Sequence, residues 1–374
     1  MSALNSGIAP RTARLTAEYT TPQALLAAVG DVSRDRVWGA GLDGSLYSIR
    51  WSGNQPPAPA AAEGNAAGSA TQAGSSNAEN KEAGKPPRAA AEAKWRLHDN
   101  YVSSLALDAD TLVSASFDRT LAWWNVPTGE LVRRVDAHEG WVRKVAFLPG
   151  GERLVSAGDD MLVKIWERAS GRCLATLTGH ARQSPQGFAT ALYAVAVHPQ
   201  EPLVATADRT GDVFVWDVSN GKPLTQFRAP EFYTYDSVKR ARSMGGIRAL
   251  AFSPDGQHLA LGGIGQITNV DGFVGPCRLE VWDWRAARRS HAAQGKHQAI
   301  QNDVRFGPAP WILSAGGGDG GGNLAFWTTA DESPVQLVKP AGHVHQLVVS
   351  DGGRRIVLAG HGGFQVWELA EEAT

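Results

Sequence analysis

The chain has 374 residues, of which 43% are hydrophobic and 20% charged, and its formal net charge at pH 7 is −1. This balance predicts a folded globular protein and lacks the overall basic excess of a dedicated nucleic-acid-binding protein. Two cysteines, Cys173 and Cys277, do not indicate a disulfide framework, and no run of about 18 apolar residues or secretory signal is present, so we expect a cytoplasmic protein without a membrane anchor.

The first ten residues have the composition of a loose terminus, and residues 11–17 are expected to form a single isolated strand. Three further strands are predicted at 24–29, 36–40 and 45–51. The Asp43-Gly44 pair before the third of them is typical of a tight hairpin turn. These segments form the beginning of the first structural unit.

Residues 52–93 interrupt this unit with a low-complexity sequence. The segment consists almost entirely of small and polar residues and contains no Trp, Phe, Ile, Leu or Val. Because such a segment cannot bury enough apolar surface to offset its ordering entropy, we expect a disordered insert. An inert insertion and a partner-binding tail are both compatible with it, and the unit resumes at 94–97.

The segment 138–177 gives the clearest structural pattern. Runs of β-branched, aromatic and aliphatic residues at 142–147, 153–158, 162–167 and 172–177 are separated by Gly, Asp and Pro turns. This pattern predicts a four-stranded antiparallel meander. Such a sheet has two apolar faces, so it must stack on similar sheets to bury them.

The same pattern recurs along the chain, and each copy closes with a tryptophan. Successive members of this series lie 42, 50, 66, 45 and 40 residues apart, which is typical of propeller blades with four strands each. The series consists of Trp124, Trp166, Trp216, Trp282, Trp327 and Trp367.

Two dipeptide signatures carry a family resemblance. Trp216-Asp217 and Trp282-Asp283 end their strands, while Gly179-His180 and Gly342-His343 precede two blades. From about residue 11 to 369 the chain therefore resembles the WD-repeat β-propellers. The resemblance implies an all-β fold of seven four-stranded antiparallel blades in one domain spanning residues 1–374.

The C-terminal blade is incomplete in sequence. It finishes its third strand at Trp367 and has no fourth strand left before the chain stops. A closed ring hides both open edges if an N-terminal strand completes the last blade. We predict that the strand at about 11–17, with Ala13 to Ala17 at its centre, pairs beside the Phe364–Trp367 strand.

The resemblance also implies two hydrogen-bonded tetrads, one in blade 2 and one in blade 3. They comprise His98, Ser114, Asp118 and Trp124, and His138, Ser156, Asp160 and Trp166. We interpret them as structural, because the sequence provides no exposed nucleophile beside an oxyanion site, and we predict no catalytic residues. In blade 4, Thr210 stands where the aspartate belongs, so the expectation is confined to blades 2 and 3.

Metal and cofactor sites are not predicted. His343, His345 and His361 form only a weak metal-ligand pattern, and zinc sites show tighter ligand spacing. The glycine-rich run 316–322 is not followed by the Lys-Ser/Thr and helix of a phosphate-binding loop. We expect a flexible corner there.

Blade 5 carries two unusually long loops, 229–246 and 264–277, which we expect to meet above this blade. Both should open on the top face, which bears the loops between blades and those between second and third strands. The loops supply the candidate partner-binding residues Phe232, Tyr233, Tyr235, Lys239, Arg240, Arg242 and Phe273. Packing of Phe232 and Tyr233 onto the propeller is an equally compatible interpretation.

The resemblance implies a non-catalytic scaffold, monomeric by itself, that binds a partner protein or peptide through the top face and the blade-5 loops. Two alternatives remain open. One is an enzyme or small-molecule binder that uses the central channel, which requires titratable groups converging on the channel mouth. The other is nucleic-acid or phosphate binding through the basic and aromatic loop 228–248, which steep salt dependence would reveal.

Overall fold

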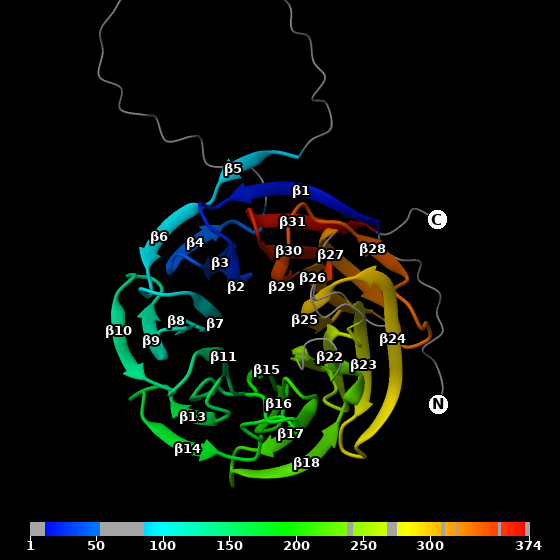
Figure 1. Ribbon diagram of the computed structural model, residues 1–374. Helices are drawn as coiled ribbons and strands as arrows, with labels where there is room; N and C mark the ends of the chain where they lie inside the picture. The colour runs from blue at the N-terminus through cyan, green and yellow to red at the C-terminus, as the bar shows by residue number, and fades with distance from the viewer. Residues whose placement is uncertain are drawn as a thin grey trace, which may run out of the picture.

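The computed structural model describes residues 12–52, 86–237, 242–267, 275–307, 311–318, 320–350 and 353–370. Apart from one three-residue 3-10 helix at Pro230–Phe232, the regular elements of these segments are strands. Figure 1 shows them as seven sheets arranged in a ring, which confirms the predicted seven-bladed propeller. The described part of the chain contains no helix long and apolar enough to cross a bilayer.

The first four blades follow one another in sequence, and each is an antiparallel meander. Blade 1 contains β2 (Leu25–Asp31), β3 (Arg36–Gly41), β4 (Ser45–Ile49) and β6 (Glu92–Arg96), and blade 2 contains β7 (Val102–Asp108), β8 (Thr111–Ser116), β9 (Thr120–Asn125) and β10 (Leu131–Asp136). Blade 3 contains β11 (Val142–Phe147), β12 (Arg153–Gly158), β13 (Val163–Glu167) and β14 (Cys173–Leu177), and blade 4 contains β15 (Leu192–Val197), β16 (Leu203–Asp208), β17 (Asp212–Asp217) and β18 (Lys222–Arg228).

A small hairpin, β19 (Tyr233–Asp236) and β20 (Arg242–Gly245), precedes blade 5. Blade 5 contains β21 (Ile247–Phe252), β22 (His258–Ile264), β23 (Pro276–Asp283) and β24 (Arg288–Gln298), and blade 6 contains β25 (Ile300–Phe306), β26 (Ile312–Gly318), β27 (Gly321–Trp327) and β28 (Gln336–Val338). Blade 7 is a sheet of β29 (Val344–Ser350), β30 (Arg355–Gly360), β31 (Gly363–Ala370), β1 (Thr12–Thr20) and β5 (Arg88–Ala90).

The core lies between neighbouring blades, as the two-faced apolar strands require. Between blades 2 and 3, for example, Val113 and Trp123 are buried in the same cluster as Val142, Leu154 and Trp166. Each sheet covers the apolar face of the next, which removes that surface from water. The repeated closing tryptophan is therefore a packing residue.

The N-terminal strand closes the ring, as predicted. β1 pairs antiparallel with β31, with Ala13 opposite Leu369 and Ala17 opposite Val366, and the two strands lie side by side in Figure 1. The Thr16 hydroxyl also donates to the Val366 carbonyl at 3.1 Å. Because both chain ends enter one sheet, blade 7 joins the first and last parts of the sequence.

The end of the predicted disordered insert is part of the fold, so its boundary at residue 93 is wrong. β5 pairs parallel with the outer edge of β1, with Glu18 opposite Arg88 and Thr20 opposite Ala90, and β6 starts at Glu92. Ala89 packs against the buried cluster between blades 7 and 1. Backbone hydrogen bonds and small alanines are enough to hold this strand, so its composition gave no signal. Residues 53–85 lie outside the described part of the chain.

Candidate partner-binding surface

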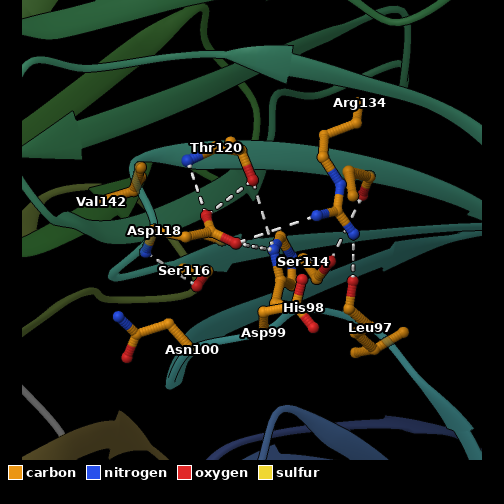
Figure 2. A network of polar contacts seen from close by, with 12 residues as sticks. Leu97, His98, Asp99, Asn100, Ser114, Ser116, Asp118, Thr120, Arg134 and Val142 are labelled. Atoms are coloured by element: carbon orange, nitrogen blue, oxygen red, sulfur yellow. Dashed lines mark hydrogen bonds and ion pairs between the residues drawn. The ribbon is translucent and has the colours of Figure 1, made fainter.

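The four predicted residues of blade 2 form one hydrogen-bonded network, and Figure 2 shows His98, Ser114 and Asp118 of it. His98 Nδ1 lies 2.8 Å from Asp118 Oδ2, His98 Nε2 lies 2.7 Å from Ser114 Oγ, and Trp124 Nε1 donates to Ser114 Oγ at 3.0 Å. Burial opposes ionisation of Asp118, yet hydrogen bonds from His98 and Thr120 hold the pKa of this carboxyl well below its ordinary value. These hydrogen bonds tie the loop before β7 to β8 and β9.

Blade 3 repeats this arrangement. His138 Nδ1 lies 2.9 Å from Asp160 Oδ1, His138 Nε2 lies 2.7 Å from Ser156 Oγ, and Trp166 Nε1 donates to Ser156 Oγ at 2.8 Å. The His98 and His138 side chains have no exposed surface. Their imidazoles therefore hold the blades together and are out of reach of a substrate.

Blade 4 has a tetrad that sequence reasoning excluded. His180 Nδ1 lies 2.8 Å from Asp208 Oδ2, His180 Nε2 lies 2.9 Å from Thr206 Oγ1, and Trp216 Nε1 donates to Thr206 Oγ1 at 2.8 Å. Thr210 occupies the expected aspartate position and donates to Asp208. Asp208 lies two residues after Thr206, on the same face of β16, so a strand position replaces the corner position. Confinement of the tetrads to blades 2 and 3 was wrong.

A hydrogen bond joins the described parts of the two blade-5 loops, and the first loop reaches blade 4. The Ile267 amide donates to Thr234 Oγ1 at 2.8 Å, which joins the two loops as expected. The Tyr233 hydroxyl donates to Gln186 Oε1 at 2.6 Å. The ring of Tyr235, whose residue is 38% exposed, lies 6.0 Å from that of Phe188. Tyr235 is therefore the aromatic side chain of this hairpin that is open to a partner.

The other candidates of the blade-5 loops divide into two groups. Phe232 has no exposed surface and belongs to the core between blades 4 and 5, so its placement in a partner-binding surface is wrong. Lys239, Arg240 and Phe273 lie outside the described residues. Arg242 begins β20 opposite Asp236, and its side chain is also outside the described part.

A second top-face surface was missed in the sequence. We call Tyr101, Phe117, Trp141, Arg143 and Tyr193 the aromatic patch; they come from blades 2, 3 and 4. Trp141 is 46% and Tyr101 is 42% exposed. The Phe117 and Trp141 rings are stacked, with centroids 4.3 Å apart and planes 4° apart, and Tyr101 lies 5.6 Å from Phe117.

Arg143 organises the aromatic patch. Its guanidinium carbon lies 5.0 Å from the ring centroid of Phe117, 4.9 Å from that of Trp141 and 5.2 Å from that of Tyr193. Asp159 holds the same guanidinium through two hydrogen bonds, from Nε at 2.6 Å and Nη2 at 2.8 Å. Such a bidentate pair fixes the arginine plane. The patch is thus ordered before any partner binds.

The inner strand of each blade, which is the first strand of its meander, has a register irregularity at the same place near the top face. The residue at this bulge is unpaired within its ladder, and bulges re-aim side chains. The seven bulge residues are Leu26, Ser103, Arg143, Tyr193, Arg248, Asn302 and His345. They mark the mouth of the central channel, whose cavity of about 480 Å³ is lined by the inner strands of all seven blades.

The three histidines of blade 7 lie close together. The His343 and His361 rings are stacked at 5.2 Å, and the His345 ring lies 5.3 Å from that of His361. Burial, followed by the neighbouring His361, lowers the pKa of His345 to about 4. Within the described ranges, no group of three or more His, Cys, Asp or Glu side chains is arranged to hold a metal ion.

Comparison with known proteins bears on both fold and surface. A family model described as "WD domain, G-beta repeat" matches residues 129–167 and 171–217, which lie in blades 2, 3 and 4. Cell division cycle 20.1, cofactor of APC complex, from Arabidopsis thaliana is 24% identical over 71% of this chain and 53% of its own length. Nuclear distribution protein nudF from Aspergillus niger is 26% identical over 57% of this chain and 46% of its own length.

A shorter match is closer in sequence. Coatomer subunit beta'-2 from Arabidopsis thaliana is 32% identical over 28% of this chain and 11% of its own length. The chain thus spans about half or less of the length of these relatives. The closed ring of seven sheets shows that the chain is a seven-bladed β-propeller, and the matched model shows WD repeats in its blades 2 to 4.

Proposed function

We propose that this chain is a non-catalytic scaffold that binds a partner protein or peptide on its top face. The observation that carries the proposal is the aromatic patch, where exposed Trp141 packs against a fixed arginine and exposed Tyr101 lies beside Phe117. Trp, Tyr and Arg are the residue types that dominate binding hot spots. Because Asp159 already orders Arg143, binding would cost little of its side-chain entropy.

The relatives support the same class of function. Two of them are named as a coatomer subunit and as a cofactor of the APC complex, so each is named as part of an assembly. Tyr235 on the blade-5 hairpin extends the proposed surface toward blade 4, since it lies beside Phe188. We place the protein in the cytoplasm as part of the same proposal.

Affinity capture from native lysate, compared between variants, tests the proposal. Trp141→Ala removes an exposed ring, so its unfolding free energy should stay near that of the wild type. The loss of a hot-spot residue should weaken a captured partner by about 2 kcal/mol, which is roughly 30-fold. Val132→Ala is the matched control, because Val132 is 55% exposed on the outer strand β10.

Two results bear against the proposal. If Trp141→Ala and Tyr101→Ala both retained partners as strongly as the wild type does, the aromatic patch would not be the binding surface. Equal loss in Val132→Ala would show that capture depends on general surface hydrophobicity. A steep decrease of capture with salt would instead favour nucleic acid.

A further inference from the structure

Two arginines share one aromatic ring at the channel mouth. The guanidinium carbon of Arg248 lies 3.8 Å from the ring centroid of Tyr193, and that of Arg143 lies 5.2 Å from the same centroid. All three are bulge residues of successive blades. Three neighbouring bulges therefore gather two cations around one phenol ring.

The charges near this ring are unevenly balanced. Arg143 has Asp159 as its carboxylate partner. For Arg248 the structure shows no ion pair with a described carboxylate, and its Nε is buried without a hydrogen-bond partner. Arg248 is thus a cation at the channel mouth whose charge is not neutralised by a direct contact in the described part of the chain.

The cavity below the Tyr193 ring also has more positive than negative side chains. Its charged lining residues, among those described, are Lys144, Arg248 and Arg305 against the single carboxylate of Asp303. Asp303 Oδ2 already accepts hydrogen bonds from Gln346 Nε2 at 2.7 Å and from Arg305 Nη2 at 3.3 Å. Because the Arg305 guanidinium already pairs with Asp303, this carboxylate offsets the charge of Lys144 only in part.

The protonation equilibria show the cost of this crowding. Burial lowers the pKa of Lys144, which Asp303 partly counteracts and Arg305 reinforces. Burial also lowers the pKa of Arg248, which Tyr193 partly counteracts and the nearby Arg143 and Arg209 reinforce. Buried like charges are unfavourable unless an opposite charge joins them. An anion in the channel would supply that charge.

Space for such an anion exists beside the two cations. In register, Lys144 follows the bulge of β11, and the corresponding residues of β15 and β21 are Ala194 and Ala249. Both alanines line the cavity together with Lys144 and Arg248. The small side chains leave the upper channel open between the cationic groups.

We propose that the upper end of the channel is a pocket for an anionic group, a carboxylate or a phosphate, carried by the protein segment that docks on the aromatic patch. This inference rests on the proposed scaffold function and names the chemistry of its partner. Arg248, stacked on Tyr193, presents planar donors suited to carboxylate or phosphate oxygens. Lys144 supplies a point charge deeper in the channel.

Inorganic phosphate is the first probe, titrated into the purified full chain by calorimetry at constant ionic strength. Loss of a charge-assisted hydrogen bond should weaken phosphate binding about 10- to 100-fold in Arg248→Gln and in Lys144→Met. Arg172→Gln is the control, because it makes the same charge change at a side chain that is 70% exposed on a turn outside the channel lining. Lys144→Met removes a partly buried charge without adding bulk, so this variant keeps the test valid if Arg248→Gln fails to fold.

Absence of phosphate binding, or equal affinity in the wild type and both channel variants, would overturn the proposal. So would an equal loss in Arg172→Gln, because the effect would then come from net charge alone. A general salting effect of phosphate acts on every variant to the same extent, so it would also give equal apparent affinities in the wild type and all the variants.

The source of the anion is resolved with degenerate peptide pools that differ only in a central phosphoserine, glutamate or alanine. Stronger binding of the phosphoserine or the glutamate pool than of the alanine pool supports the proposal and identifies the group. Equal retention of all three pools, or of none, overturns it. Capture that still depends on Trp141 would leave the scaffold function intact in that case, so the two failures are distinguishable.

Discussion

Replacement of His138 by alanine tests whether the tetrads are structural. The imidazole is fully buried, and its removal deletes the contacts to Asp160 at 2.9 Å and to Ser156 at 2.7 Å. The variant takes one partner away from the buried Asp160 carboxylate, and breaking a buried pair of this kind typically costs about 3–5 kcal/mol. The Glu139 and Leu162 amides still donate to Asp160, so we expect the lower end, about 3 kcal/mol.

Urea unfolding followed by tryptophan fluorescence measures the change, and hydrogen exchange locates it. Faster exchange should be confined to the loop before β11, to β12 and to β13, because the tetrad links this loop to these two strands. His258→Ala is the control, since the His258 side chain is partly exposed and makes no hydrogen bond to a described residue; it should change stability by less than about 0.5 kcal/mol. A His138→Ala protein with wild-type unfolding and uniform exchange would refute the structural role.

Three further predictions follow from the contacts of the loops, the histidines and the closing strand. Burial lowers the pKa of His345 from 6.5 to about 4, so the contribution of the neutral imidazole to the free energy of unfolding should be fully present above pH 6.5. The free energy of unfolding should decrease by roughly 3 kcal/mol as the pH falls to 4. His345→Gln should flatten this pH dependence in urea titrations. Phe232→Ala should lower the unfolding free energy by about 3–5 kcal/mol, whereas Tyr235→Ala should leave it unchanged and weaken only partner capture; a reversal of the two would contradict the assigned burial. Deletion of residues 1–20 should expose the edge of β31 and cause aggregation in light scattering, while deletion of 1–11 should not, and a monodisperse, folded 1–20 deletion would disprove closure by β1.

The ring could be predicted because its determinants are periodic. Apolar alternation and turn residues recur in every blade, and a tryptophan closes the third strand of blades 2 to 7, so local pattern and global fold agree. Even the non-local pairing of β1 with β31 followed from counting strands, since a closed ring permits no missing edge. Here the topology itself supplied the long-range information.

The errors occurred where a residue's role depends on which face of a strand it occupies. Phe232 could be interpreted equally as a partner-binding residue or as packing onto the propeller, and the 3-10 turn at Pro230–Phe232 directs it into the core. Asp208 completes the blade-4 tetrad from a strand position, which a fixed spacing rule could not find. Arg88–Ala90 has no apolar signal because its pairing uses backbone groups and alanine packing.

The channel mouth was hidden from sequence reasoning for a related reason. Strand alternation assigns each residue to one of two faces, and a bulge breaks that alternation by one residue. Arg143, Tyr193 and Arg248 lie at such bulges, far apart in the chain, and each looks unremarkable as a polar or aromatic residue near a strand start. Only the register brings two guanidinium groups to one ring. Since the same bulge recurs in all seven inner strands, the fold provides seven equivalent positions at the mouth, and the residues placed there set its charge. Substitution at these positions can therefore change partner chemistry while the interblade cores, built from other residues, stay intact.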